Sequence, residues 1–168
     1  RFEVEGRITA AGRVEPEVAA EEVSRVAAEL ERAGVAAAAV CLLNSYLVPD
    51  EERRVASALK TRLPALVVVA SVDISPESGE YERASTAVVN AYVAPAVGSY
   101  LENLERGLKE QGIASPFYVM QSSGGLLRSS EARRRPVNLI ESGPAAGVVA
   151  TRELTRALGP VSYTHLRA

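Results

Sequence analysis

The feature that most constrains the fold is an uninterrupted apolar run, residues 35–43, set between two segments with helical periodicity. The run has the length of a strand and no polar residue, which is typical of a strand buried on both faces of a parallel sheet. Before it, a helical pattern ends at Gly34, and after it a helix is expected to begin at Pro49. A second short apolar run follows at residues 66–70. The order helix, strand, helix, strand predicts an α/β layer.

The other expected elements extend this alternation along the chain. Further strands are expected at residues 2–10, 116–121 and 137–140. Further helices are expected from Pro16 to Gly34, over 80–93 and over 144–158. Pro95 is expected to break or kink the helix over 80–93, and a second helix then runs to about Gln111. A short helix is expected after residue 128, with Ser129 and Ser130 as its N-cap candidates. The apolar stripes of two helices are Val23, Val26, Ala27 and Leu30 in the first, and Tyr81, Ala84, Val88 and Tyr92 in the helix over 80–93. The acids in the first turn of the Pro49 helix, where the helix dipole favours them, are Asp50, Glu51 and Glu52.

Composition and charge limit the possible functions. Of the 168 residues 47% are hydrophobic and 24% charged, and the formal net charge is −2. A role with nucleic acid or an anionic membrane surface therefore has no electrostatic support. The single cysteine, Cys41, excludes a disulfide framework within the chain and fits a reducing compartment, so a cytoplasmic location is expected. No apolar run approaches the roughly 20 residues that span a bilayer.

Both ends of the sequence are expected to be interrupted. Arg1 already lies in an expected strand, and residues 161–168 resemble the translation of a sequencing-library adapter. Excluding that tail also excludes His165, the only histidine. The rest of the chain then has no histidine to serve as a general base, a triad member or a metal ligand.

Two glycine-containing turns form the first candidate site. Gly124 and Gly125 follow an apolar run, and Ser142 and Gly143 precede a helix that begins at Pro144. Glycine lets a ligand approach the backbone, and a helix start presents free N–H groups and a positive dipole end. The pattern predicts either an anion or phosphate cradle or ordinary turn chemistry.

Polar residues at the end of the buried run and on the helix over 80–93 form a second candidate group. Asn44 and Ser45 follow the run, and ligands tend to bind at the carboxyl ends of strands in open α/β sheets. A turn that bonds its own backbone is the alternative. On or beside the helix lie Glu80, Glu82, Arg83, Ser85, Thr86 and Asn90. They are interpreted either as catalytic carboxylates with a counter-charge or as a solvated face with a structural ion pair.

Four stretches of the chain carry recognisable motifs. They are 40–46 (Val-Cys-Leu-Leu-Asn-Ser-Tyr), 75–86 (Ser-Pro-Glu-Ser-Gly-Glu-Tyr-Glu-Arg-Ala-Ser-Thr), 120–126 (Met-Gln-Ser-Ser-Gly-Gly-Leu) and 141–148 (Glu-Ser-Gly-Pro-Ala-Ala-Gly-Val). Together they resemble the hydantoinase/5-oxoprolinase family, and within it the A subunit of hydantoin-utilising enzymes. The resemblance runs in colinear order through residues 1–160.

The resemblance implies a partial actin-like (sugar kinase/Hsp70-type) ATPase fold, which is an α/β fold, truncated here at both ends. It implies a cytoplasmic enzyme that uses ATP and Mg²⁺ to open cyclic amides such as hydantoin or 5-oxoproline by phosphorylating the amide oxygen. One alternative activity is the ATP-dependent carboxylation of a ketone, since the family is related to the acetone carboxylase beta subunit. Another alternative is a non-catalytic actin-like scaffold. A B-type subunit or fused domain is the implied partner, and an oligomer is expected for the complete protein. The implied division is 1–92 for the remainder of the N-terminal region, 93–160 for the start of the A domain, and 161–168 for the adapter.

The resemblance also suggests roles for single residues. Glu141 is expected near Mg²⁺ or the nucleotide, with Glu82 and Arg83 as further catalytic candidates. The cofactor-binding candidates are Gly124, Gly125, Ser142 and Gly143, and the candidates for a substrate side or an interface are Asn44, Ser45 and Asn90. No residue of the chain is predicted to ligate a metal directly. The family's Asp-x-Gly-Gly-Thr phosphate loops are expected outside residues 1–160, so the chain alone is expected to be inactive.

Overall fold

The buried apolar run forms a strand, β1 (Ala37–Val40), in the computed structural model, which describes residues 1–159. It pairs in parallel with β2 (Val67–Ala70), with Ala37 opposite Val67 and Val40 opposite Ala70. The helix between them, α2 (Pro49–Arg62), makes the crossover that parallel strands require. Both predicted strands are confirmed, each shorter than its apolar run.

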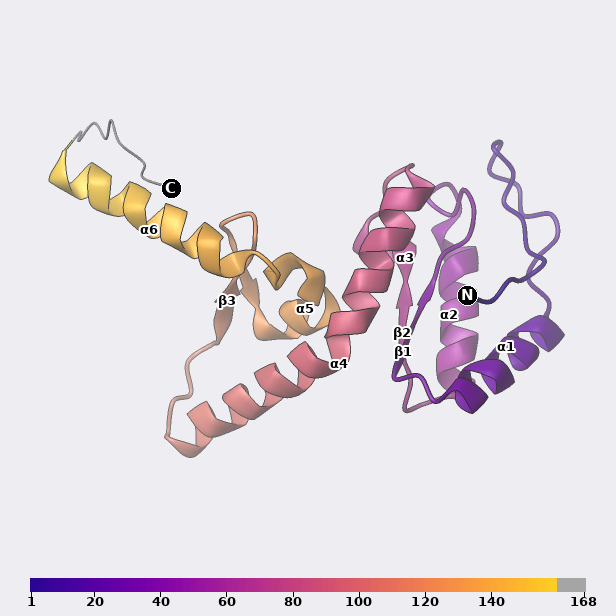
Figure 1. Cartoon of the computed structure of the whole chain (residues 1–168), viewed down its shortest axis with the longest axis horizontal. Helices are drawn as coiled ribbons and strands as arrows, with labels where there is room; N and C mark the ends of the chain where they lie inside the picture. The colour runs from indigo at the N-terminus through magenta and orange to yellow at the C-terminus, as the bar shows by residue number, and fades with distance from the viewer. Residues whose placement is uncertain (160–168) are drawn as a thin grey trace. The chain divides into compact units, whose positions relative to one another are not determined.

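Two helices pack with this sheet (Figure 1), and their apolar faces supply most of the core. The first helix, α1 (Ala20–Ala33), ends at Gly34, whose φ of 60° is left-handed and whose N–H donates to the Glu31 carbonyl. The core residues of α1 and α2 are Val23, Val26, Ala27, Leu30, Val55 and Leu59. The predicted stripe of α1 is therefore confirmed, and burying each valine or leucine contributes about 1.5–3 kcal/mol.

The strand predicted over residues 2–10 is wrong, and α1 begins later than Pro16. Residues 1–19 contain only an isolated antiparallel bridge, between Ile8 and Val14. The Thr9 N–H donates to the Arg13 carbonyl at 2.8 Å, so the segment bonds to itself across a tight turn and adds no strand to the sheet. Alternating apolar residues thus indicated an extended backbone without specifying its partner.

A single long helix, α4 (Glu80–Glu110), replaces the two helices predicted around Pro95. A proline removes one bond of the helical ladder, and the helix can continue on both sides of it. The segment before α4 is partly helical, because Ser71–Ile74 form the short helix α3. The buried residues of α4 include Arg83, Ala87, Asn90, Ala91 and Ala94, while most of the predicted apolar stripe is exposed.

A β-hairpin opens the part of the chain after α4. The predicted strand forms as β3 (Tyr118–Met120), which pairs antiparallel with β4 (Leu126–Arg128). No strand was predicted at the position of β4, between the glycine-containing turn and the next helix. Two helices follow, α5 (Ser129–Arg134) and the 3-10 helix η1 (Pro136–Leu139). The strand predicted over 137–140 is therefore wrong, because that apolar segment has no partner strand. The chain as described ends with α6 (Ser142–Leu158), which confirms the predicted last helix.

The serines expected to cap α5 have other roles. The N-cap residue of α5 is Arg128, and no side-chain hydrogen bond caps the helix. The Ser129 hydroxyl instead donates to the Glu105 carboxylate, which also lies 3.5 Å from Arg133. Glu105, on the neighbouring helix α4, thus contacts both the Ser129 hydroxyl and Arg133.

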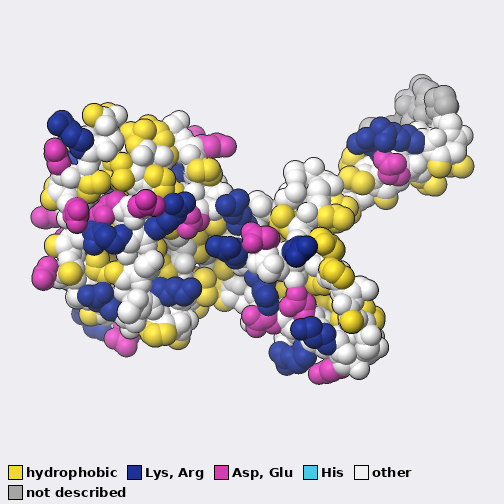
Figure 2. Space-filling view, turned by 180° about the vertical axis from the view of Figure 1, so that it is seen from behind, with side chains coloured by type: hydrophobic (Ala, Val, Ile, Leu, Met, Phe, Trp, Pro, Cys, Tyr) yellow, Lys and Arg dark blue, Asp and Glu magenta, His cyan; other side chains and the backbone are white. Residues whose placement is uncertain are grey.

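The chain divides into two units, Arg1–Asn103 and Leu104–Ala168, and the division falls within α4. Figure 2 shows acidic and basic side chains interspersed over one face of the molecule, without a large area of one sign. Among residues 1–159, no helix combines the length and the apolar character needed to cross a membrane. The predicted adapter, residues 161–168, lies outside the described residues.

Candidate functional site

A buried arginine lies at the carboxyl ends of β1 and β2. Arg83, in the first turns of α4, has a fully buried side chain. Its Nε donates to the Ser71 hydroxyl at 3.1 Å, and one terminal nitrogen donates to the Leu42 carbonyl at 2.9 Å. The other terminal nitrogen donates to the Glu77 carbonyl at 3.0 Å. The guanidinium therefore joins the ends of both strands to α4.

A buried glutamate from α2 completes this network from the other side. Glu52 is fully buried and accepts the Leu42 N–H at 2.7 Å, the Ser71 hydroxyl at 2.8 Å and the Val72 N–H at 2.9 Å. Leu42 is therefore held at its N–H by Glu52 and at its carbonyl by Arg83. Ser71 accepts from Arg83 and donates to Glu52, so it links the two side chains.

The loop that follows this anchored residue carries the predicted Asn44. Its φ of 55° is left-handed, a conformation that asparagine tolerates better than most residues. The Asn44 N–H donates to the Glu80 carboxylate at 2.9 Å, and its side-chain amide donates to the Ile8 carbonyl at 2.9 Å. The hydrogen bond from the Asn44 N–H is the main cause of a pKa of Glu80 below its usual range. The positive charge of Arg83, 3.5 Å away, also lowers this pKa. Asn44 and Arg83 thus meet at Glu80.

Ser45 differs from every other polar side chain in this loop. It is fully buried, and its Oγ is the one buried side-chain polar atom in the described part of the chain without a hydrogen-bond partner. An unsatisfied buried hydroxyl costs about 1–3 kcal/mol, so such groups often belong to sites completed by water or by another molecule. The next side chain, Tyr46, has its ring 5.8 Å from the Arg83 guanidinium carbon.

The remaining candidates on α4 face in different directions. The side chain of Glu82 is exposed, whereas Asn90 is fully buried together with Arg83. The acid that pairs with Arg83 is Glu80, on the preceding helical turn. The geometry of this group combines a buried hydrogen-bond network around Arg83 with an ion pair between Arg83 and Glu80, whereas Glu82 lies on an exposed face. The catalytic roles of Glu82 and Arg83 stay predictions.

In the second unit, Ser122 joins the two glycine-containing turns. Its N–H and its hydroxyl both donate to the Asn138 carbonyl, at 2.6 and 2.8 Å. The Glu141 N–H in turn donates to the Ser122 hydroxyl oxygen at 3.0 Å. The hairpin turn and the start of α6, which are separate in the sequence, are therefore tied together by one serine.

Gly124 and the start of α6 differ in how crowded their backbones are. Gly124 has a φ of +83°, and a Cβ there would lie 3.2 Å from Val149 Cγ2 on α6. Gly143 has open space around the position of a Cβ, and the side chain of Glu141 is exposed. Ser142, the first residue of α6, is half-buried. Gly124 thus has a close neighbour on α6, while Gly143 at the start of that helix borders open space.

Replacing Gly124 with alanine is expected to lower the free energy of unfolding by about 1–3 kcal/mol, because an L-residue at positive φ is strained and Val149 must also move. The matched control is Gly147→Ala, in the middle of α6 with no atom within 4 Å of its added methyl. That change is expected to stabilise by roughly 0.5–1 kcal/mol, because alanine favours a helix over glycine. Urea unfolding of the two variants tests the opposite signs, and equal effects would contradict this assignment.

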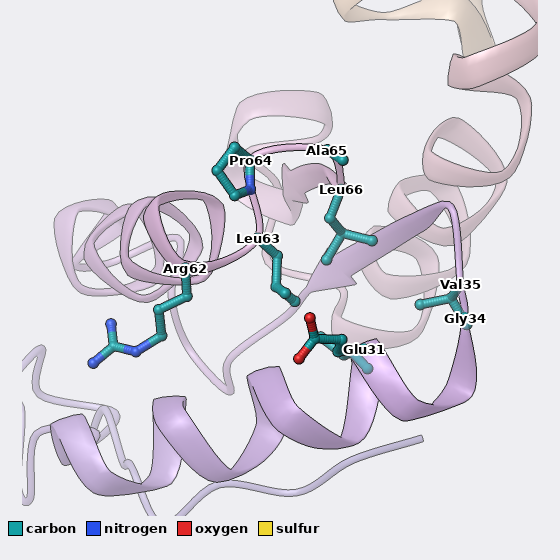
Figure 3. A pocket seen from close by; sticks show the side chains of 9 residues that line it. Glu31, Gly34, Val35, Arg62, Leu63, Pro64, Ala65 and Leu66 are labelled. Carbon is teal, nitrogen blue, oxygen red and sulfur yellow. The ribbon is translucent and has the colours of Figure 1, made fainter.

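A shallow groove of about 380 Å³ lies elsewhere, next to the amino ends of β1 and β2. Its lining residues are Leu30, Glu31, Gly34, Val35, Arg62, Leu63, Pro64, Ala65 and Leu66 (Figure 3). The lining is mainly apolar, and the Arg62 guanidinium is already bonded to Ser24 Oγ and to the Ala58 carbonyl. The groove contains none of the predicted site residues, and Glu31 is the one carboxylate in its lining.

The side chains of the described residues do not form a complete metal site. In residues 1–159 no three or more histidine, cysteine, aspartate or glutamate side chains gather closely enough to hold a metal ion. Glu141 is a single exposed carboxylate beside a helix start. These residues can contribute to an anion or metal site, but they do not form the whole of one.

Two members of the Arg83 network were not predicted from the sequence: Ser71, which bonds to Arg83 directly, and Glu52, which is linked to it through Ser71 and Leu42. Glu52 was assigned to the solvated first turn of a helix, yet it lies three residues before Val55 and seven before Leu59 on the buried stripe. An acid at a core-facing helical position is the signal that could have identified it. Ser71, directly after β2, had no comparable signal, because serine after a strand usually marks a turn.

Several curated proteins share extended similarity with the chain. It is 39% identical to an uncharacterized protein of Methanocaldococcus jannaschii over 94% of this chain and 23% of that protein. It is 38% identical to the caprolactamase subunit alpha of Pseudomonas jessenii (67% of this chain, 16% of that one) and 32% identical to the 5-oxoprolinase of Saccharomyces cerevisiae (71% and 9%). The chain therefore spans less than a quarter of the length of these relatives.

Two solved structures resemble the structure closely. One is the ATP-dependent caprolactamase from Pseudomonas jessenii, with a TM-score of 0.84 and 30% identity over 94% of this chain and 23% of that one. The other is acetone carboxylase in a nucleotide-free structure, with a TM-score of 0.82 and 28% identity over 93% and 22%. The mixed α/β architecture described above is thus shared with parts of two larger enzymes.

Family models match most of the sequence in two consecutive pieces. Residues 1–63 match the hydantoinase/oxoprolinase N-terminal region, and residues 83–163 match hydantoinase/oxoprolinase itself. The second match includes Arg83, both glycine-containing turns and the whole of α6, and the first includes Asn44, Ser45 and Glu52. The family predicted from four short motifs is confirmed: the chain belongs to the hydantoinase/oxoprolinase family.

Proposed function

We propose that this chain is part of an ATP-dependent hydrolase that opens the ring of a cyclic amide. The observation that carries the proposal is the match to caprolactamase, which combines 38% identity in sequence with a TM-score of 0.84 in structure. The similarity to 5-oxoprolinase supports the same substrate class, because both names refer to an amide within a ring. The actin-like fold and the division into 1–92 and 93–160 belong to this proposal.

ATP, with Mg²⁺, would supply the activation of an amide carbonyl that water alone attacks slowly. In this chain the start of α6 is the place that fits a phosphate group. The N–H groups of Ser142 and Gly143 and the positive end of the helix dipole favour an anion, whereas Pro144 has no N–H to offer. The open space at Gly143 leaves room for such an anion. Ser142 and the backbone of Gly124 and Gly125 would border it, and the exposed Glu141 would attract the cation or its waters.

The carboxyl edge of the sheet would have a different role in the same protein. Asn44 and Ser45 are proposed to face the substrate or an interface, because the Ser45 hydroxyl lacks a partner among the described residues. Arg83 would act as a positioning residue, because its three hydrogen bonds hold the strand ends from which that loop leaves. Asn90 is buried in the same helix, and Glu82 is exposed at its start. A partner subunit is proposed as well, since the caprolactamase relative is itself named as a subunit.

The reaction is tested by ADP release from the complete protein with a panel of substrates. Caprolactam, 5-oxoproline and hydantoin represent cyclic amides, and acetone with bicarbonate represents the alternative suggested by the acetone carboxylase structure. We expect at least one cyclic amide to stimulate ADP release and to yield a ring-opened product. Stimulation by the ketone and bicarbonate alone would refute the proposal and favour a carboxylase.

Replacing Glu141 with glutamine in the complete protein is expected to lower kcat/KM by about 100-fold, the scale of removing one group that stabilises charge in a transition state. The substitution keeps the shape of the side chain and removes its charge. The activity is also expected to require more Mg²⁺, which a merely structural role would not change. The control is Glu153→Gln on the same helix, where the exposed side chain pairs with Arg152 and Arg156. Equal activity of both variants would remove Glu141 from the site.

A further inference from the structure

The exposed side of α4 has the composition of an interface. From Ala84 to Leu101 the helix carries no charged residue. Tyr81, Val88 and Tyr92 follow one another at intervals of seven and four residues, so they lie on one side of the helix. Their exposed fractions are 81%, 59% and 84%. We call this side, completed by Ser85 and Val89, the tyrosine face.

The opposite side of α4 combines apolar residues, among them Ala87, Ala91 and Ala94, with two polar ones. It is buried, yet it carries the charged Arg83 and the polar Asn90. A helix on the surface of a folded protein normally has charged residues on the side that contacts water and apolar residues on the buried side. Here the uncharged tyrosines and valines face outward. An uncharged stretch as long as that from Ala84 to Leu101 is typical of a helix that is buried all round in a larger protein.

The residue types on the tyrosine face point the same way. The cores of protein interfaces are depleted of charged residues and enriched in tyrosine, because a tyrosine buries a large area with few rotatable bonds. The exposed glutamate Glu82 lies beside the face near Tyr81. An uncharged centre with a charge at its edge is the arrangement found in interfaces.

We propose that the tyrosine face is covered, in the complete protein, by an uncharged apolar surface from another part of the same polypeptide. The length of the relatives supports this occupant. More than nine-tenths of this chain matches each of the two solved structures, but the match covers only 22–23% of those structures, so most of such a polypeptide lies outside this chain. A second copy of the chain is a poorer match, because the stretch from Ala84 to Leu101 offers no charged residue to set the register of two identical helices. The inference is independent of the reaction proposed above.

Thiol labelling of the complete protein tests this contact. Tyr92→Cys places a thiol at the centre of the tyrosine face, and Val88→Cys is a second probe in case the first variant does not fold. Ser57→Cys, on the exposed side of α2, is the matched control, and Cys41→Ser removes the native thiol of this region. The rate of maleimide attachment to each cysteine is followed by peptide mass spectrometry, in buffer and in urea.

We expect the thiols at positions 92 and 88 to react at least about tenfold more slowly in buffer than in urea, since a covered site is labelled only when it opens. The thiol at position 57 should differ by less than about twofold between the two conditions, because an exposed site needs no opening. Labelling at position 92 as fast as at position 57 would overturn the proposal. Protection that disappears on dilution would also overturn it, because the occupant would then be a second copy or another subunit.

Discussion

Replacing Arg83 with methionine is expected to lower the free energy of unfolding by about 3–5 kcal/mol, the cost of removing one partner from a buried charged network. Methionine fills a similar length of space but donates no hydrogen bond. The carbonyls of Leu42 and Glu77 would lose donors at 2.9 and 3.0 Å, and the Ser71 hydroxyl would lose one at 3.1 Å. Urea unfolding followed by circular dichroism measures the loss.

Two further variants separate the network from charge alone. Arg83→Lys keeps the positive charge but lacks the planar fork that reaches three acceptors, so we expect it to recover only part of the stability. Arg134→Met removes an exposed arginine that lies 3.6 Å from Glu131, and surface pairs of this kind contribute less than about 1 kcal/mol. If Arg83→Met cost no more than Arg134→Met, the network would not stabilise the fold.

The elements that could be predicted from sequence are those that bury one apolar face against the core. In α1 the recurrence of Val23, Val26 and Leu30 sets both the helix and the side that packs, and Gly34 ends it through a left-handed φ. In β1 the apolar run was sufficient, because a strand covered on both faces needs no polar alternation. In each case a local pattern and its tertiary environment demand the same thing.

The tyrosine face shows where that logic stops. Tyr81, Val88 and Tyr92 form a regular apolar stripe, which periodicity alone assigns to the core. The structure buries the other side of α4, where Arg83 and Asn90 lie. Periodicity reports that a side is apolar, and it cannot report which partner covers that side.

The candidate site in the second unit was located by its turns, but their roles could be separated only in the structure. The pattern around Gly124, Gly125 and Gly143 predicted either an anion or phosphate cradle or ordinary turns. Gly124 instead meets Val149 on α6, while Gly143 borders open space. Ser122, which no role was assigned to, is the residue that ties the hairpin to Glu141. A serine that bonds across the sequence leaves no local pattern to detect.

Replacing Glu52 with glutamine is expected to cost about 2–4 kcal/mol, because a buried donor left without its charged acceptor loses more than an ordinary hydrogen bond. The carboxylate accepts two N–H groups and one hydroxyl. Glutamine has only one oxygen, so its amide nitrogen must face a donor. Isothermal urea unfolding measures the change, and Asp50→Gln, at a highly exposed position in the same turn, is the matched control. Equal losses in the two variants would show that the helix dipole, and not the buried contacts, explains the effect.

The double variant of Arg83→Met and Glu52→Gln distinguishes one network from two independent contacts. The two side chains share Leu42 and Ser71 as partners, so their effects should not add. Once Arg83 is gone, Ser71 can rotate and the strand ends can relax, and the second change then removes bonds that are already weakened. We expect the double variant to be more stable than the sum of the single losses predicts, by about 1–3 kcal/mol, as found for residues in one hydrogen-bonded network. If the losses in the free energy of unfolding were strictly additive, Arg83 and Glu52 would act as independent contacts, although both bond to Leu42 and Ser71.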